Sequence, residues 1–143
     1  MKNVQIINGP NLNLLGKREK HLYGYESFES VLSQLRRKYP KVTIEHVQTN
    51  IEGHIVDEIH KADKWADAIV LNPGGFTHTS IAIRDAVLAV DIPVTEVHIS
   101  NIASREGFRH NSVISGACDG CITGFGINGY FLAIENLLLL DIP

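Results

Sequence analysis

The stretch AIVLNPGGFTHTSIAIRDAVLAVDIPVTEVHIS, residues 68–100, decides the fold of this chain. Its first four residues, Ala68–Leu71, are all apolar, as expected of a strand that is covered on both faces. Apolar residues at helical spacing follow over residues 80–90, and Pro93 ends that helix. Residues 94–99 then form the next expected strand. A strand–helix–strand unit of this kind predicts two parallel strands joined by a right-handed crossover.

The same alternation extends in both directions along the chain. Helical spacing marks residues 27–39, 51–65 and 127–140, and short apolar or alternating runs mark strands at residues 4–7, 42–47 and 120–125. Strands that alternate with helices form a parallel sheet with helices on both faces. We therefore expect a single α/β domain over residues 1–143, with a flavodoxin-like, doubly wound, five-stranded parallel sheet.

Length and composition exclude several classes of protein. The chain has 143 residues and a formal net charge of −3, from 13 basic and 16 acidic residues. It is too short for an eight-stranded α/β barrel, which needs ~200 residues, and its charge balance argues against a dedicated nucleic-acid binder. No apolar stretch approaches the ~18–20 residues of a membrane span. The polar residues Asn8–Asn11 come too early for a signal peptide, which predicts a cytoplasmic protein.

Polar side chains stand at the ends of four of the five expected strands. Asn8–Asn11 follow the first strand, Thr49 and Asn50 the second, Asn72 the third, and His98–Asn101 end the fourth. In doubly wound sheets, ligands bind beyond the carboxyl ends of the strands, where the strand order reverses. Turn chemistry explains some of these amides, but their convergence predicts a site at this edge of the sheet.

The polar segment between Gly16 and Gly24 is a candidate lid over that site, spanning residues 16–25. Loops of this length in a compact domain are usually functional or disordered, and a glycine at each end suits a segment that closes over a ligand. Arg18 and Tyr23 can meet if the loop folds back. A guanidinium beside the phenol would stabilise the phenolate and make Tyr23 a usable base near neutral pH. The alternative is a solvated, charged loop.

The segment Asn72–Ser80 connects the third strand to a helix and carries glycines, hydroxyls and His78. Glycines let a backbone approach a ligand, and the start of a helix presents free N–H groups that suit an anion. Thr77, Thr79 or Ser80 is expected to cap the helix. His78 therefore has two open interpretations, a ligand contact or a helix-end residue.

Glu96, His98 and Ser100 share one face of the fourth strand, because side chains alternate along a strand. A carboxylate two residues before a histidine can orient the imidazole and favour its charged form. We therefore expect His98 and Glu96 to act as a pair at the edge of the sheet. A purely structural histidine is the alternative.

Arg105 and Arg109 lie four residues apart in the segment that follows the fourth strand. Two arginines near a binding edge indicate a carboxylate ligand. A surface turn with an ion pair to Glu106 explains the same spacing equally well.

Two further motifs carry less weight. Gly124–Gly129 matches the G-x-G-x-x-G pattern of dinucleotide sites, but too little chain follows to supply the acidic residue that grips a ribose. Close packing of a helix on the sheet is the better interpretation.

Cys118 and Cys121 have the C-x-x-C spacing of a redox pair. They lie beside and within an expected late strand, however, and not at the start of a helix. A flavin- or nucleotide-binding module remains the main alternative function, although it predicts a phosphate loop rich in Ser and Thr after the first strand.

In combination and in this order, the polar segments resemble type II 3-dehydroquinate dehydratase over nearly the whole chain. The residues that carry the resemblance are Asn8-Gly9-Pro10-Asn11, Gly16-x-Arg18-Glu19 with Tyr23-Gly24, Gln48-x-Asn50-x-Glu52-Gly53, Asn72-x-Gly74-Gly75-x-Thr77-His78, Glu96-Val97-His98-Ile99-Ser100-Asn101, Arg105-Glu106-x-Phe108-Arg109 and Gly124-x-Gly126-x-x-Gly129-Tyr130.

This resemblance implies dehydration of 3-dehydroquinate to 3-dehydroshikimate, in the shikimate pathway of aromatic amino acid biosynthesis or in quinate breakdown, without a metal ion or an organic cofactor. By position, Tyr23 corresponds to the base, Arg18 to the arginine that activates it, and His98, supported by Glu96, to the proton donor. The residues that match substrate contacts are Asn11, Asn72, His78, Ile99, Ser100 and Arg109.

The resemblance also implies an assembly, a dodecamer built from trimers, in which Asp85 reaches the site of a neighbouring subunit. The sequence departs from the family pattern at three positions. Lys20 stands where a proline is usual, and Ala103 and Asn111 stand where histidines are common. These departures bear on the lid and the arginine segment, not on the class of reaction.

Overall fold

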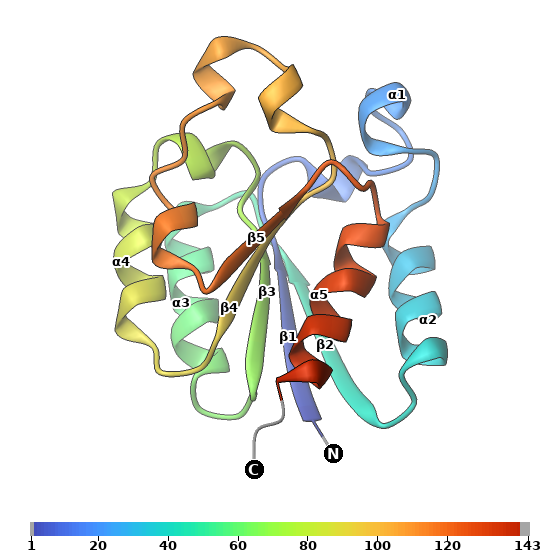
Figure 1. Ribbon diagram of the computed structural model, residues 1–143, viewed down its shortest axis with the longest axis vertical. Helices are drawn as coiled ribbons and strands as arrows, with labels where there is room; N and C mark the ends of the chain where they lie inside the picture. The colour runs from blue at the N-terminus through green and yellow to red at the C-terminus, as the bar shows by residue number, and fades with distance from the viewer. Residues whose placement is uncertain (1, 141–143) are drawn as a thin grey trace.

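Five parallel strands form the centre of the structure, a computed structural model that describes residues 2–140 (Figure 1). They lie in the order β2-β1-β3-β4-β5, which confirms the predicted flavodoxin-like sheet. Every predicted strand is present, although two are shorter at their carboxyl ends than the pattern suggested. The strands are β1 (Lys2–Asn8), β2 (Val42–Gln48), β3 (Ala68–Asn72), β4 (Val94–His98) and β5 (Gly120–Thr123).

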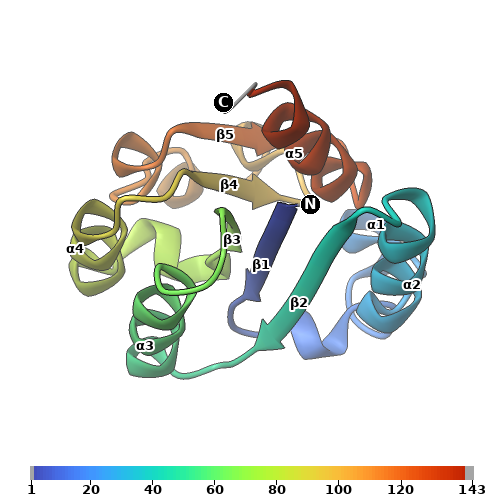
Figure 2. The ribbon, with the colours of Figure 1, turned by 90° about the horizontal axis from the view of Figure 1, so that it is seen from below.

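Four long helices cover the two faces of the sheet, two on each face (Figure 2). One apolar core joins β1 and β3 to α2 (Phe28–Lys38) and α5 (Asn128–Leu139). A second core joins the opposite face of the strands to α3 (Glu52–Ala62) and α4 (Ile81–Ala89). Because both faces are covered, all five residues of β3 are buried, as its continuous apolar pattern predicts.

The predicted helix boundaries agree closely with the structure, and side-chain caps explain two of the starts. The Ser27 hydroxyl accepts a hydrogen bond from the backbone N–H of Ser30 at the start of α2. Ser80 accepts one from the N–H of Ile83 at the start of α4, and so it is the cap among the three candidates in that segment.

The Gly124–Gly129 motif serves packing, as expected. A Cβ atom added at Gly129 would lie 3.0 Å from the Val97 side chain of β4, a distance that real side chains do not accommodate without movement. The absence of a side chain therefore lets the first turn of α5 lie directly on the sheet.

The fold brings two asparagines together at the point where the strand order reverses. Asn8 at the end of β1 is in register with Asn72 at the end of β3, and the chain leaves these two strands in opposite directions. Loops that follow β1, β3 and β4 gather at this edge, where α1 (Lys20–Tyr23) and the segment 102–117 rise above the sheet (Figure 1). The segment 16–25 is therefore not loop throughout, because it contains one short helix. Within residues 2–140, no helix is both long and apolar enough to cross a membrane.

Candidate active site

A pocket opens at the carboxyl edge of the sheet, between the segment after β1 and the segment after β4. Nine residues that the family resemblance assigns to the site line this pocket together: Asn11, Arg18, Tyr23, Asn72, His78, His98, Ile99, Ser100 and Arg109. Further lining residues include Arg105, Gly74, Gly75 and Ile102. A cavity whose walls carry this many donors suits a small, polar, anionic molecule.

Two of the expected site residues do not line the pocket. Glu96 is completely buried behind His98, so it acts on the site only through that histidine. Asp85 lies on an exposed face of α4, outside the pocket.

His98 and Glu96 form a buried pair at the end of β4. The Nε2 atom of His98 lies 2.5 Å from Oε2 of Glu96, which is the same-face pairing that strand alternation predicts. Since Nε2 is occupied, the other ring nitrogen, Nδ1, is the one left to exchange a proton with a molecule in the pocket. The orientation of the imidazole is thus set by a carboxylate that solvent does not reach.

Two hydroxyl groups complete the surroundings of Glu96. Thr77 donates to Oε2 at 2.6 Å and Ser115 donates to Oε1 at 2.5 Å. Burial alone would raise the pKa of Glu96, but the hydrogen bond and charge from His98, together with the two hydroxyl groups, outweigh it and lower that pKa below its usual value. The carboxylate therefore stays charged beside the ring of His98. Sequence reasoning missed Thr77 and Ser115 in this role, because they meet Glu96 only in the folded structure.

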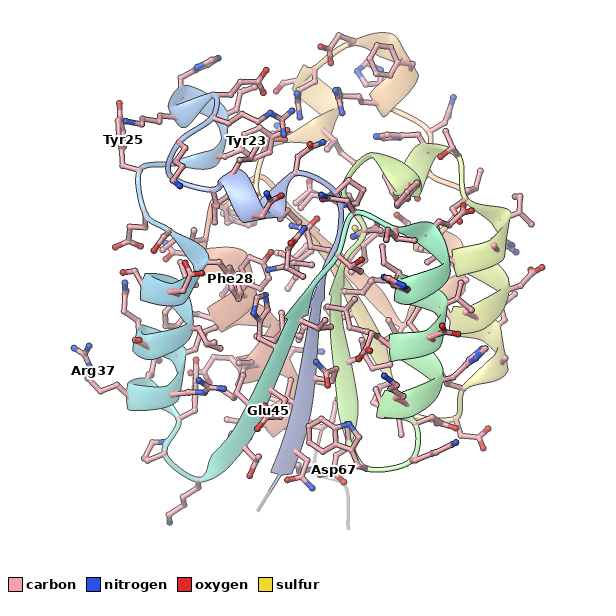
Figure 3. The ribbon with its side chains drawn as sticks, turned by 180° about the vertical axis from the view of Figure 1, so that it is seen from behind. Tyr23, Tyr25, Phe28, Arg37, Glu45 and Asp67 are labelled. Carbon is pink, nitrogen blue, oxygen red and sulfur yellow. The ribbon has the colours of Figure 1, made fainter. Side chains whose placement is uncertain are left out.

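Tyr23 points from α1 toward the segment after β4, whereas Tyr25 points away from it (Figure 3). The Tyr23 hydroxyl accepts a hydrogen bond of 2.8 Å from Nη1 of Arg105, which also donates to the Ser100 hydroxyl at 3.2 Å. Cζ of Arg105 lies 5.5 Å from the centre of the Tyr23 ring. A guanidinium in this position stabilises a phenolate by charge and by a direct hydrogen bond.

Arg18 approaches the same tyrosine from another side. Its Cζ atom lies 5.2 Å from the centre of the Tyr23 ring, and its guanidinium pairs with Glu19 at 3.6 Å. The cation that touches the phenol oxygen is thus Arg105, 82 residues away in sequence, and not Arg18. The sequence had indicated Arg105 as a carboxylate ligand, and its partner Tyr23 could not be inferred from spacing.

The ring of His78 is held from outside the pocket. Its Nδ1 lies 2.7 Å from the backbone oxygen of Asn111; because a carbonyl only accepts, Nδ1 carries a proton and Nε2 is left for the pocket. Arg109 lines the pocket and also pairs with Glu106 at 2.6 Å. Arg109 therefore fits both interpretations of the arginine spacing, because it lines the pocket and also forms the ion pair with Glu106.

Two asparagines line the wall nearest the sheet. Asn11 adopts a left-handed backbone conformation with φ 69°, and its N–H donates to the side chain of Asn50 at 3.0 Å. The polar residue after β2 thus supports the loop after β1 without lining the pocket. The Asn72 amide donates to the Tyr130 hydroxyl at 2.9 Å and accepts from the N–H of Gly74 at 3.1 Å.

Cysteine and metal chemistry find little support in the described residues. Burial raises the pKa of Cys118 to about 12 and that of Cys121 to about 11, so the reactive thiolate is scarce at neutral pH. Within residues 2–140, no three His, Cys, Asp or Glu side chains group in a way that could hold a metal ion.

Comparison with known proteins points to one family. The family described as Dehydroquinase class II matches residues 2–138. A 3-dehydroquinate dehydratase of Caldicellulosiruptor bescii is 56% identical over 140 residues, which cover 96% of this chain and 97% of that protein. A catabolic 3-dehydroquinase of Botryotinia fuckeliana is 51% identical, covering 94% of this chain and 91% of its own. The crystal structure of a type II dehydroquinase from Butyrivibrio crossotus superposes with a TM-score of 0.92 at 46% identity, covering 96% of this chain and 97% of its own.

Proposed function

The chain belongs to the class II dehydroquinase family, and from this premise we propose how its residues divide the dehydration of 3-dehydroquinate to 3-dehydroshikimate. The observation that carries the proposal is that one pocket holds a tyrosine hydroxyl bound by a guanidinium and a histidine bound by a buried carboxylate. The first pair suits a base and the second suits an acid.

The chemistry of the substrate explains why both are needed. In a β-hydroxy ketone, the difficult step is removal of a proton from the carbon beside the carbonyl group, which leaves an enolate. The hydroxyl group two carbons from the carbonyl then departs, and it must receive a proton to leave as water. A positioned base and a positioned acid each contribute ~10²–10⁴-fold to such a reaction.

Tyr23 is the base in this proposal. Arg105 donates to its oxygen and Arg18 lies against its ring, so two positive charges stabilise the phenolate that accepts the substrate proton. Because Tyr23 belongs to the segment that rises over the pocket, closing this segment would bring the base to the substrate and exclude water at the same time.

His98 is the acid. Glu96 stabilises the imidazolium through Nε2, and Nδ1 delivers the proton to the departing hydroxyl group. After one turnover the phenol holds the proton taken from the substrate and the imidazole is neutral. Exchange of protons with solvent restores both groups.

The remaining lining residues bind the substrate. The backbone N–H groups of Ile99 and Ser100 and the guanidinium of Arg109 suit the carboxylate. Asn11, Asn72 and His78 suit the hydroxyl groups and the carbonyl oxygen. None of these roles needs a metal ion or an organic cofactor, because charge develops on atoms that side chains can reach.

We also propose a homo-oligomer, a dodecamer built from trimers, in which Asp85 of one subunit completes the site of its neighbour. On α4, Ile81 and Leu88 lie on the same side of the helix as Asp85, and both are more than half exposed. Exposed apolar residues around a carboxylate suit a protein interface.

The proposed place of action is the cytoplasm, in the shikimate pathway of aromatic amino acid biosynthesis. One relative named 3-dehydroquinate dehydratase is 56% identical and one named a catabolic 3-dehydroquinase is 51% identical, so a growth experiment has to test the biosynthetic role. Expression in a strain that lacks its own enzyme should restore growth without aromatic amino acids. Failure to grow, with an active purified protein, would contradict the biosynthetic role.

The direct test of the reaction is spectroscopic. The product has a carbon–carbon double bond conjugated with its carbonyl group, whereas the substrate has none. Purified protein mixed with 3-dehydroquinate should produce a rising ultraviolet absorbance, and replacement of His98 by Asn should abolish most of that rise. An unchanged absorbance with the unmodified protein would refute the proposed activity.

A further inference from the structure

A line of hydrogen bonds leads from the pocket wall to the edge strand β2, along the face of the sheet that α2 and α5 cover. It begins at Asn72, whose Nδ2 atom donates to the Tyr130 hydroxyl at 2.9 Å. Tyr130 donates to Oδ1 of Asn8 at 2.7 Å. The Nδ2 atom of Asn8 lies 3.1 Å from Nε2 of His46, on β2. Asn8 and Tyr130 are completely buried and Asn72 nearly so.

The direction of each hydrogen bond follows from its neighbours. Gly74 donates its N–H to Oδ1 of Asn72, so the Asn72 amide must present Nδ2 to Tyr130. The Tyr130 oxygen accepts that hydrogen bond and uses its single proton on Asn8. Asn8 is then left with Nδ2 to donate to His46, and His46 must accept at Nε2.

The two ionisable members are held in the forms that this direction needs. Burial lowers the pKa of His46 to about 4, with Glu29 opposing and Arg36 reinforcing the shift, so the imidazole is neutral and Nε2 accepts at neutral pH. Burial raises the pKa of Tyr130 far above its usual value, so its hydroxyl keeps its proton. The ring of His46 also packs on Phe28, with 4.3 Å between ring centres.

We propose that His46, Asn8 and Tyr130 are positioning residues that fix the orientation of the Asn72 amide, so that its second N–H always faces the pocket and donates to a substrate oxygen. This inference rests on the proposed function, since it assumes that Asn72 contacts the substrate. It assigns Asn72 a defined part in specificity: the site accepts an oxygen with a free lone pair at that position and rejects a group that can only donate.

The alternative direction shows why the far end matters. If the residue at position 46 presented a donor, Asn8 would have to turn its oxygen toward it. Tyr130 would then donate to Asn72, which would turn its own oxygen inward and lose the hydrogen bond from Gly74. The Gly74 N–H and the acceptor on β2 thus fix the orientation of the Asn72 amide from the two ends of the line.

Replacement of Tyr130 by Phe tests the inference, because it removes one oxygen and preserves the buried ring. We expect KM for 3-dehydroquinate to rise by roughly three- to tenfold, the range for loss of one net hydrogen bond, with a smaller change in kcat. The matched control is Tyr39→Phe, which removes a hydroxyl bound to Glu135 from a ring of the same core and should leave KM unchanged.

A double-mutant cycle separates a positioning role from general loosening of the site. If Tyr130 acts through Asn72, then Tyr130→Phe should have no further effect on KM in an Asn72→Ala background. Additive effects would overturn the inference while leaving the proposed function intact. An Asn72→Ala variant with unchanged KM would overturn it as well, together with the contact assigned to Asn72.

His46→Phe gives an independent test if Tyr130→Phe does not fold. The substitution keeps an aromatic ring against Phe28 and removes only the acceptor, at a position outside the pocket. KM should rise in the same direction as for Tyr130→Phe, by a smaller factor, and the rise should again vanish in the Asn72→Ala background. An unchanged KM for His46→Phe would contradict the part assigned to His46.

Discussion

At the scale of single residues, Tyr23 and His98 face one pocket. Each is hydrogen-bonded to a charged partner. Arg105 donates a hydrogen bond to the Tyr23 hydroxyl, and Glu96 lies against Nε2 of His98. In both pairs the partner is a charged side chain, a guanidinium for Tyr23 and a carboxylate for His98. Replacing a residue of one pair should therefore affect a different step of the reaction from replacing a residue of the other.

Tyr23→Phe removes the base and keeps the ring. We expect kcat to fall by ~10²–10⁴-fold, the usual contribution of a general base, while KM changes little. Measured kcat for Tyr25→Phe provides the control, because Tyr25 is a largely exposed tyrosine of the same segment. A Tyr23→Phe variant with near-normal kcat would show that another group takes the proton.

The two arginines should differ in their effect on kcat. A guanidinium that donates to the oxygen of the base makes a charge-assisted hydrogen bond there, whereas one that lies against the ring makes none. Because Arg105 touches the oxygen and Arg18 only the ring, Arg105→Ala should lower kcat by a larger factor than Arg18→Ala. Equal losses of kcat, or none, would argue against the assigned division of roles.

The sequence predicts the residues of the pocket better than their partners. Strand alternation places Glu96 beside His98, because both lie on one short element. The contacts of Arg105 with Tyr23, and of Thr77 and Ser115 with Glu96, join separate loops. No local pattern fixes how such loops meet, so only the folded structure reveals them.

At the scale of elements, the carboxyl end of β4 places two polar side chains, Glu96 and His98, in the interior of a largely apolar sheet. Glu96 is wholly buried, and its charge is tolerated because His98 and two hydroxyl groups surround it. The elements themselves were predictable, because apolar periodicity marks every strand and every long helix. The short helix α1 was not, since its four residues are too few to show a period.

Glu96 should make stability depend on pH in a defined window. Its pKa in the folded protein lies below the ordinary value of 4.5, so the unfolded chain binds the proton more readily. The stabilisation is then complete well above that value and is lost as the pH falls below it. Urea unfolding of Glu96→Gln should show a flatter decline of the unfolding free energy between about pH 5 and pH 3 than the unmodified protein. Parallel declines would mean that the carboxylate is not linked to folding.

At the scale of the whole molecule, the fold brings together at one edge of the sheet the pocket residues, which the sequence spreads from Asn11 to Arg109. Parallel strands all end on the same side, and the reversal of order between β1 and β3 opens the space for a ligand there. This general position was predictable from the sequence. The proposed contacts with another copy were not predictable in the same way, because a single chain's periodicity does not say which exposed face takes part.

The prediction at this scale concerns assembly through the exposed face of α4. Leu88→Glu should prevent assembly, as seen by light scattering, and lower kcat/KM by roughly tenfold, the cost of losing one charged hydrogen bond to the site. The matched control is Leu139→Glu, at an exposed leucine on the opposite face of the sheet. A Leu88→Glu protein that is monomeric and fully active would contradict the role given to Asp85.

The most direct measurement is a crystal structure of the protein with a non-reacting analogue of 3-dehydroquinate in the pocket. We expect the Tyr23 oxygen and Nδ1 of His98 to lie on opposite faces of the bound ring, each within about 2.6–3.2 Å of the atom with which it exchanges a proton. A bound analogue that touches neither group, with Tyr23 turned toward solvent, would contradict it.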